Sequence, residues 1–213
     1  MISNNLYVIA AICGNFWQES TVNPGIWENL TVGAPGYGLG QWTDNPPAVM
    51  RRTELFNWLS SNGYSQDSGD GQLAFLVHEN IWIPSLFQQS AYNTLTDFFQ
   101  STSTNLGDLV REWMYHWEGI DDGSYQTRYD AALDYLDVLR NDDGTREPWY
   151  SSNSYNTAGH ARWNVLRIKD FFLGETPEPP EPPEPGELTV DELAGIVRLL
   201  KKRGKKGGIY IEW

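Results

Sequence analysis

The chain has 213 residues, of which 28 are acidic and 15 are basic, and its formal net charge is −13. This length is enough for one main domain with a small appendage, and the acidic balance argues against nucleic-acid binding, which requires Lys and Arg to neutralise phosphates. The only cysteine, Cys13, excludes an intramolecular disulfide bond and is expected to be a buried, unreactive thiol.

The start of the chain predicts one buried helix followed by a glycine-rich loop. Apolar residues recur at helical spacing from Leu6 to Trp17, which indicates a helix with one wide buried face, and Ser3 or Asn4 can cap its start. The sequence Asn-Pro-Gly at 23–25 should stop this helix. Residues 32–42, VGAPGYGLGQW, contain four glycines, so we expect a loop or tight hairpin whose backbone can approach a ligand.

Further helices are predicted along the rest of the domain. Apolar periodicity, polar caps and closing glycines indicate them at 51–63, 70–82, 90–102, 105–119, 126–140 and 160–172. The pattern is clearest in the fifth of these, where acidic residues lie opposite an apolar face made of Tyr129, Leu133, Leu136 and Leu139. We therefore predict a mainly α domain over residues 1–175.

A part of different composition follows this domain. Residues 176–186, TPEPPEPPEPG, repeat Pro and Glu and predict an extended, semi-rigid linker of roughly 30 Å at about 3.1 Å per residue. Residues 1–186 hold 9 basic and 24 acidic residues, whereas residues 187–213 hold 6 basic and 4 acidic ones. The last segment predicts a short amphipathic helix, a basic stretch and the strand-like IYIEW, which we interpret as an anchor on another protein; a frayed, solvated tail is the alternative.

Glu19 stands at the end of the first helix, on a face otherwise made of core residues. Ile12, Phe16 and Glu19 follow the i, i+4, i+7 spacing of one helix face. A carboxyl group set against apolar and aromatic side chains holds its proton to a higher pH, which suits a general acid. The alternative is a helix-end glutamate that points into solvent.

Three motifs follow closely on one another, GNFWQES at 14–20, NPGIWE at 23–28 and GYGLGQWT at 36–43. Together they resemble the phage tail lysozyme family of the lysozyme and lytic transglycosylase superfamily. In that superfamily a glutamate followed by serine ends a helix, as Glu19 and Ser20 do, and a glycine-rich segment ending in glutamine lies across the cleft. The resemblance continues through Arg51 or Arg52, QLAFLVHE and WEGIDDGSYQTRYDAALDY, and covers roughly residues 6–140.

The resemblance implies a lysozyme-like fold that cleaves the β-1,4 bond between N-acetylmuramic acid and N-acetylglucosamine in bacterial peptidoglycan. It assigns the catalytic acid to Glu19, which would protonate the departing glycosidic oxygen. Glu28, Asp44 and Glu79 are candidates for a second carboxylate, and Asp44 is favoured because it follows the glycine-rich segment directly. Without one, water held by neutral groups such as Gln41, or the substrate's own 6-hydroxyl group as in lytic transglycosylases, would complete the reaction.

Substrate-binding residues are expected around the glycine-rich segment. The rings of Trp27, Tyr37 and Trp42 can stack on sugar faces, with core packing as the alternative. Gln41 can bind an acetamido group, and Gly40 and Ser20 are expected to contribute to the same surface. The histidines show no metal-ligand spacing and the glycine-rich loop lacks the Lys-Ser/Thr of a phosphate-binding loop, so no metal or cofactor is expected.

We therefore expect a phage-type muramidase of the virion, attached to structural proteins of the phage tail by its C-terminal segment and acting on the bacterial cell wall. The sequence shows neither a secretory signal nor a membrane-spanning segment, which fits synthesis in the host cytoplasm. The acidic domain would gain nothing from attraction to an anionic wall, which favours delivery by attachment. A free endolysin, a lytic transglycosylase, and a non-catalytic tail-structural or wall-binding module are the alternatives.

Overall fold

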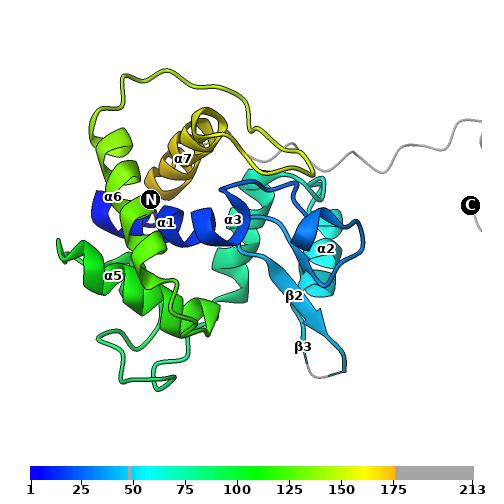
Figure 1. Ribbon diagram of the computed structural model, residues 1–213, viewed down its shortest axis with the longest axis horizontal. Helices are drawn as coiled ribbons and strands as arrows, with labels where there is room; N and C mark the ends of the chain where they lie inside the picture. The colour runs from blue at the N-terminus through cyan, green and yellow to red at the C-terminus, as the bar shows by residue number, and fades with distance from the viewer. Residues whose placement is uncertain (48, 176–213) are drawn as a thin grey trace, which may run out of the picture. The chain divides into compact units, whose positions relative to one another are not determined.

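Helices dominate the part of the chain that the structure describes, residues 1–47 and 49–175 of a computed structural model (Figure 1). These residues belong to the first of two units into which the chain divides, Met1–Pro180. The predicted mainly α fold class is confirmed. The predicted linker at 176–186 and the predicted anchor at 187–213 lie outside the described residues.

Most of the elements are helices, and three short strands near the start of the chain form one small sheet. In chain order they are α1 (Leu6–Ser20), the 3-10 turn η1 (Glu28–Leu30), β1 (Gly36–Tyr37), β2 (Trp42–Asn45), β3 (Val49–Met50), α2 (Arg51–Ser61), α3 (Gly69–Glu79), α4 (Leu95–Phe99), α5 (Leu106–Trp113), the π-helical turn η2 (Met114–Glu118), α6 (Tyr125–Arg140) and α7 (Ala158–Leu173). None of the helices in the described ranges is both long and apolar enough to cross a lipid bilayer.

Helix α1 runs through the core, and almost its whole circumference is buried. Every residue from Val8 to Phe16 is buried because α5, α6 and α7 all pack against this helix (Figure 1). The sequence predicted one wide buried face for this helix. The buried surface extends further around it, because α7 packs against it as well as α5 and α6. The cap is Asn5 and not Ser3 or Asn4, because its side chain accepts a hydrogen bond from the backbone N–H of Tyr7 at 3.0 Å.

Helix α6 approaches α1 closely at Gly14. A Cβ atom at this position would lie 2.4 Å from the carbonyl oxygen of Arg128 and 2.7 Å from the Cβ atom of Ala132. The buried residues of α6 are Arg128, Ala131, Ala132, Tyr135, Leu136 and Leu139. Leu133 was predicted to face the core, but it is 44% exposed because the stripe that meets α1 starts at Arg128 and not at Tyr129.

The helix predicted at 105–119 consists of α5 and the π-helical turn η2. The turn ends at Glu118, and Gly119 follows it with a φ of 74°. Trp113 and Trp117 stack with their ring centroids 4.8 Å apart and fill the space behind this turn. Glu118 is the last residue of this turn, so the wider pitch of the π-helical turn sets the direction of its side chain.

The glycine-rich segment forms a tight hairpin, one of the two conformations predicted for it. Strands β1, β2 and β3 pair antiparallel in that order, with Tyr37 opposite Trp42. Side chains alternate along β2, so that Trp42 and Asp44 are buried while Thr43 between them is exposed. The hairpin therefore presents Thr43 outward and packs Trp42 and Asp44 inward.

The two ends of the described domain lie side by side. The backbone N–H groups of Ile2 and Ser3 both donate to the carbonyl oxygen of Phe172, at 2.8 and 3.1 Å. Gly174 follows with a φ of 75°, and a Cβ atom there would lie 2.9 Å from the backbone nitrogen of Met1. Helix α7 thus closes the domain against its first residues.

Replacement of Gly14 by alanine is expected to destabilise the fold by about 1–3 kcal/mol, the usual cost of overpacking a core. The matched control is Gly159→Ala in the first turn of α7, where the nearest atom to an added Cβ is Oγ1 of Thr157 at 3.8 Å. That change should be neutral, or stabilise by up to about 1 kcal/mol through helix propensity. Urea denaturation measures both variants, and equal effects at the two positions would contradict the close approach of α6 to α1.

Candidate active site

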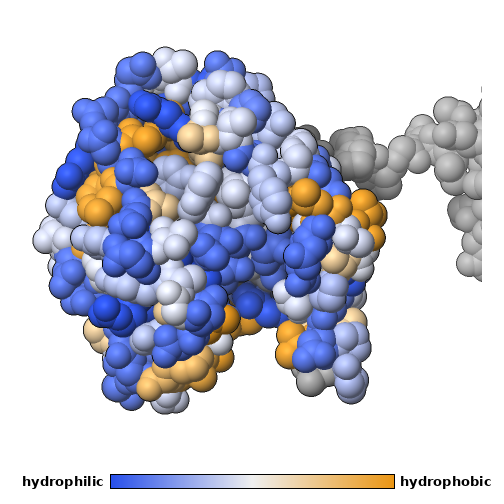
Figure 2. Space-filling view, in the orientation of Figure 1, coloured by the Kyte–Doolittle hydropathy of each residue, from blue (hydrophilic) through white to orange (hydrophobic). Residues whose placement is uncertain are grey.

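A pocket of about 410 Å³ opens where α1 ends, between the glycine-rich hairpin and η2. The space-filling view shows the surface hollowed between the hairpin of β2 and β3 and the side of the domain that carries α5 (Figure 2). Its lining includes the acidic residues Glu19, Glu28 and Glu118 and the cation Arg51. Among the described residues, no group of His, Cys, Asp and Glu side chains could hold a metal ion.

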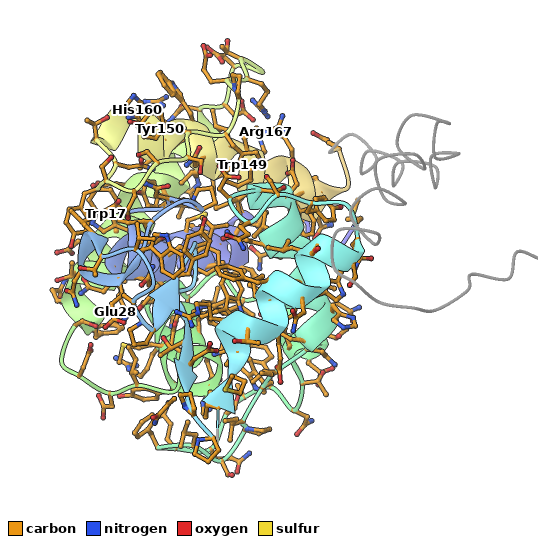
Figure 3. The ribbon with its side chains drawn as sticks, turned by 90° about the vertical axis from the view of Figure 1, so that its right-hand side faces the viewer. Trp17, Glu28, Trp149, Tyr150, His160 and Arg167 are labelled. Carbon is orange, nitrogen blue, oxygen red and sulfur yellow. The ribbon has the colours of Figure 1, made fainter. Side chains whose placement is uncertain are left out.

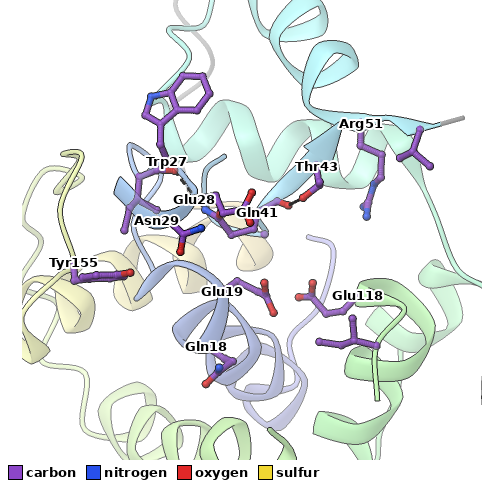
Figure 4. Close-up of a pocket in the computed structure, with 14 residues that line it drawn as sticks. Gln18, Glu19, Trp27, Glu28, Asn29, Gln41, Thr43, Arg51, Glu118 and Tyr155 are labelled. Carbon is purple, nitrogen blue, oxygen red and sulfur yellow. Dashed lines mark hydrogen bonds between the residues drawn. The ribbon is translucent and has the colours of Figure 1, made fainter. Parts of the chain in front are cut away.

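Glu19 lies on the last turn of α1 and lines this pocket, with 20% of its side chain exposed. Its Oε1 atom accepts a hydrogen bond from Nη2 of Arg128 at 2.5 Å. The side chain therefore points into a pocket and not into bulk solvent, and a cation holds it in place (Figure 4).

Arg128 is buried, with only 1% of its side chain exposed, and every nitrogen of its guanidinium group has a partner. Nε donates to Oγ of Ser124 at 2.8 Å, and Nη1 donates to Oδ1 of Asn15 at 3.1 Å. Nη2 donates to Glu19. A buried charge is tolerated only when it is paired and hydrogen-bonded, so Arg128 depends on the carboxylate of Glu19.

Glu118 faces Glu19 across the pocket (Figure 4). Its own burial and then the charge of Glu19 raise the pKa of Glu118 well above the ordinary value of 4.5. The cations Arg128 and Arg51, and a hydrogen bond of 3.2 Å from Nε1 of Trp113, oppose this rise without cancelling it. Because two facing carboxyl groups resist carrying two charges, the pair holds one proton to a higher pH than a solvated glutamate would.

Arg51 is fixed beside Glu118 by a carboxylate and an indole ring. Its Nη2 and Nε atoms donate to the two oxygens of Glu79 at 2.8 and 3.3 Å, and its guanidinium carbon lies 4.8 Å from the ring centroid of Trp117. Nε1 of Trp42 donates to the same Glu79 carboxylate at 2.9 Å. Glu79, one of the predicted candidates for a second catalytic group, is thus the counter-ion of Arg51 and does not line the pocket.

The charges around Glu118 balance when it carries a proton. The two cations nearest to it are already paired, Arg128 with Glu19 and Arg51 with Glu79. Within the described part of the chain, both cations that act on Glu118 therefore already have a carboxylate partner. This arrangement provides a proton in a pocket that also contains a fixed negative charge, the two components that acid-assisted glycoside cleavage requires.

Ser20 and Gly40 position the walls of the pocket. The hydroxyl group of Ser20 bonds to the carbonyl oxygens of Phe16 at 2.9 Å and Leu39 at 2.8 Å, which ties the end of α1 to the glycine-rich segment. At Gly40 a Cβ atom would lie 2.4 Å from the ring of Trp117, so only glycine lets the backbone pass there. Gly40 lines the pocket, whereas Ser20 is buried beneath it.

Trp42 and Tyr37 belong to the core. Trp42 has no exposed surface, and its ring packs edge-on against Trp117 with centroids 5.7 Å apart. Tyr37 is 4% exposed, and its ring lies 4.7 Å from that of Trp27. Neither residue lines the pocket between α1 and the hairpin. Their positions fit the alternative of core packing, and the predicted stacking on sugars has no support from them.

Gln41 lines the pocket, but its amide nitrogen is engaged in the hairpin. Nε2 donates to the carbonyl oxygens of Gly38 at 3.1 Å and Ile26 at 3.4 Å, and the residue has a φ of 44°. The hydroxyl group of Thr43 donates to the backbone oxygen of Gln41 at 2.7 Å. Gln41 therefore holds the hairpin in shape at the pocket wall.

Asp44 lies on the opposite face of β2 from Thr43 and does not line the pocket. Its carboxylate accepts hydrogen bonds from Nη2 of Arg52 at 2.9 Å and from the backbone and hydroxyl of Thr53 at 3.0 and 2.7 Å. Although burial opposes the change, these bonds hold the pKa of Asp44 below its ordinary value. The residue joins the hairpin to α2, and its predicted catalytic role remains a prediction that its position does not favour.

Glu28, the remaining predicted candidate for a second carboxylate, also lines the pocket. Its Oε2 atom accepts a hydrogen bond from the backbone N–H of Gly36 at 3.1 Å. The contact joins η1 to the start of β1. Glu28 therefore has a place in the pocket and a structural partner, and Glu118 is the carboxyl group that faces Glu19 (Figure 4).

Two residues were not singled out from the sequence: Glu118, which lines the pocket, and Arg128, which is buried behind Glu19. Both lie within the stretch WEGIDDGSYQTRYDAALDY that carries part of the family resemblance. Arg128 could have been found from periodicity, because it precedes Ala132, Tyr135 and Leu139 at the spacing of one helix face. For Glu118 no such signal exists, since its position depends on the π-helical turn.

Comparison with known families matches residues 5–139 to the family described as phage tail lysozyme. That match covers more than half of the chain and includes Glu19, Glu118 and Arg128. The chain belongs to the phage tail lysozyme family. The residues of this lysozyme domain that form the pocket lie within the match, apart from Tyr155.

The phage tail lysozyme domain is also similar to part of a second phage protein. Morphogenesis protein 1 of Bacillus phage B103 is 44% identical over 73 residues, which are 33% of this chain and 18% of that protein. The chain thus spans less than a fifth of the length of this relative. Together, the family and the relative establish a phage protein with a lysozyme-like domain.

In this phage tail lysozyme domain, Glu118→Gln should remove a carboxyl group whose loss of a proton destabilises the fold as pH rises. Because the pKa of Glu118 is raised in the folded state, the folded chain binds more protons than the unfolded chain above about pH 4.5, and stability falls with pH at up to about 1.4 kcal/mol per pH unit. The unfolding free energy of the variant minus that of the wild type should therefore grow more positive as pH rises above about 4.5. Urea titrations measure it, with the exposed Glu147→Gln as control; a flat difference would contradict the raised pKa.

Proposed function

We propose that this domain cleaves the β-1,4 bond between N-acetylmuramic acid and N-acetylglucosamine in bacterial peptidoglycan. The observation that carries the proposal is the pair Glu19 and Glu118, which face one another across the pocket (Figure 4), together with the raised pKa of Glu118. Membership of the phage tail lysozyme family supports the same substrate. A peptidoglycan strand would lie along the pocket with its scissile oxygen beside the pair.

In the proposed reaction the carboxyl pair protonates the departing glycosidic oxygen. Glu118 holds the proton at rest, because its pKa is raised, and Glu19 is bonded to Arg128. Glu19 delivers the proton, since it projects from the end of α1 and the family resemblance assigns it the role of acid. The proton passes within the pair as the sugar displaces water, which weakens screening and favours neutral carboxyl groups in the pocket.

Loss of the leaving group creates positive charge at the anomeric carbon, and the pocket supplies negative charge to stabilise it. Once the proton has left, the pair carries two carboxylates beside the charged sugar ring. We propose that water then attacks this carbon and gives one proton back to the carboxylate pair, so that the domain acts as a muramidase. Attack by the 6-hydroxyl group of the same sugar is the lytic transglycosylase route, and it begins with the same proton transfer.

The products distinguish these routes, and the variants test the acid. Reducing muramyl ends in mass spectra of digested peptidoglycan indicate hydrolysis, whereas anhydromuramyl ends indicate transglycosylation. The rival of another class, a tail-structural or wall-binding module without chemistry, predicts that purified walls are bound and never cleaved.

Glu19→Gln and Glu118→Gln should each lower the rate of peptidoglycan cleavage by about 10²–10⁴-fold, the contribution of a positioned acid. Asp44→Asn should keep most of the activity, because Asp44 bonds to Arg52 and Thr53 and not to the pocket. Turbidity loss of purified walls measures the rates, and circular dichroism confirms that each variant is folded. A large loss in Asp44→Asn with full activity in Glu118→Gln would overturn the proposed pair and restore Asp44 as the second carboxylate.

We also propose that residues 187–213 attach the domain to structural proteins of the phage tail. The support is their composition, which differs in charge from the rest of the chain, and the similarity to a phage morphogenesis protein. Free lysin activity is the competing possibility, in which the basic segment would bind anionic envelope surfaces and salt would weaken this binding.

Deletion of residues 187–213 should leave cleavage of soluble wall fragments unchanged, because every residue of the pocket lies before residue 156. The same deletion should abolish incorporation into phage particles. Immunoblots of purified particles measure incorporation, and a released-sugar assay measures cleavage. Normal incorporation of the shortened protein would contradict the anchor, whereas lost cleavage would show that the segment contributes to the domain itself.

A further inference from the structure

One wall of the pocket comes from a part of the chain outside the family match. The match ends at residue 139, and Tyr155 lies 16 residues beyond it. Tyr155 nevertheless lines the same pocket as Glu19 and Glu118, with 61% of its surface exposed (Figure 4). A large aromatic residue is thus kept on the surface, at the edge of the pocket and at a distance from the core.

The segment that carries Tyr155, residues 149–157, which we call the strap, is anchored at its start by aromatic and amide contacts. Trp149 covers the first residue of α3, because a Cβ atom at Gly69 would lie 2.3 Å from its ring. The ring of Tyr150 stacks on that of His160 in α7 with centroids 3.6 Å apart. The side chain of Asn164 bonds to both the N–H and the carbonyl group of Tyr150, each at 2.8 Å. Figure 3 shows Trp149, Tyr150 and His160 on this side of the domain.

The middle of the strap holds the loop that forms the pocket wall. Oδ1 of Asn153 accepts a hydrogen bond from the backbone N–H of Trp27 at 3.0 Å, and its Nδ2 donates to the carbonyl oxygen of Leu30 at 3.0 Å. These bonds bracket η1, which carries Glu28 and Asn29 on the pocket wall. Strap and wall therefore form one fixed surface.

The backbone on both sides of Tyr155 is tied to the loop that follows α1. Nδ2 of Asn23 donates to the carbonyl oxygen of Ser154 at 2.6 Å, and the N–H of Asn156 donates to Oγ1 of Thr21 at 2.8 Å. The Tyr155 ring is thus exposed while its backbone is held. A ring presented in this way loses little conformational freedom when a ligand covers it, which is the usual property of a binding platform.

We propose that Tyr155 forms a saccharide subsite at the outer end of the pocket, which binds a sugar ring of the glycan strand other than the two that flank the cleaved bond. This inference rests on the proposed function. The flat ring offers an apolar face to the C–H groups of a pyranose, and its hydroxyl offers a polar edge. Gln18 and Asn29, which line the same pocket and are exposed, can bond to hydroxyl and acetamido groups.

A subsite away from the reacting bond contributes to substrate binding only when the substrate is long enough to reach it. A strand long enough to reach Tyr155 gains the contact, whereas a shorter strand leaves the ring in water. The strap therefore gives this chain a preference for long glycan strands, a property that the family-matched residues 5–139 do not supply alone.

The experiment compares wild type, Tyr155→Ala and Tyr155→Phe on GlcNAc–MurNAc oligosaccharides of increasing, defined length. Loss of the ring should raise KM for long strands roughly three- to tenfold with kcat nearly unchanged. It should leave the shortest cleavable strand unaffected, and Tyr155→Phe should behave much like wild type. The matched control is Phe87→Ala, which removes another exposed ring, 53% exposed, that does not line the pocket.

Equal effects of Tyr155→Ala at all strand lengths, or no effect at any length, would overturn the subsite. A second measurement separates this outcome from failure of the proposed reaction: calorimetric binding of the same strands to Glu19→Gln, with and without Tyr155→Ala. If wild type cleaves nothing but the double variant binds long strands more weakly than Glu19→Gln does, the subsite stands and the reaction fails. If Glu19→Gln binds no strand of any length, the subsite is refuted.

Discussion

The buried ion pair of Arg128 and Glu19 is the interaction on which both the fold and the pocket depend. Arg128 comes from α6, and its partners Asn15 and Glu19 come from α1, so the guanidinium group joins the two helices at their closest approach. Leaving such a charge without its partner costs about 3–5 kcal/mol. The group that fixes the helix pair is therefore the group that fixes the proposed acid, and stability and chemistry cannot be changed independently here.

The pair also explains why the neighbouring carboxyl group keeps a proton. Glu118 stands beside a carboxylate whose cation is already engaged, and its own burial also disfavours its charged form. The sequence argument predicted a carboxyl group with a raised pKa at Glu19 and did not single out Glu118. In the structure, burial and then the charge of Glu19 raise the pKa of Glu118.

Local patterns were sufficient to predict most of the fold. The helical periodicity around α1 and α6 and the glycines of the hairpin gave the elements and the end of α1 at which Glu19 stands. Patterns could not show which helices would meet, so the burial of α1 by α7 and the exposure of Leu133 were missed. They also could not anticipate η2, whose altered pitch places Glu118, because no single residue type specifies a π-helical turn.

The aromatic residues divide differently from the prediction. Adjacency to the glycines suggested that Trp42 would line the pocket, yet strand alternation turns it inward and brings Thr43 to the surface. The ring that does stand exposed at the pocket, Tyr155, is more than a hundred residues away in the sequence and reaches it through tertiary contacts of the strap. Gly40, Gln41 and Trp27 do line the pocket, so proximity in sequence failed for the ring of Trp42 and not for its neighbours.

The meeting of the first residues with the end of α7 has a practical consequence. Because the N–H groups of Ile2 and Ser3 share the carbonyl oxygen of Phe172, a short peptide can join the two ends without disturbing the core. The domain is therefore suited to circular permutation, with new ends opened in the exposed turn around Gly144. It can equally be inserted as a cassette into a surface loop of an unrelated carrier, which would then hold the pocket of Glu19 and Glu118 at a single fixed point.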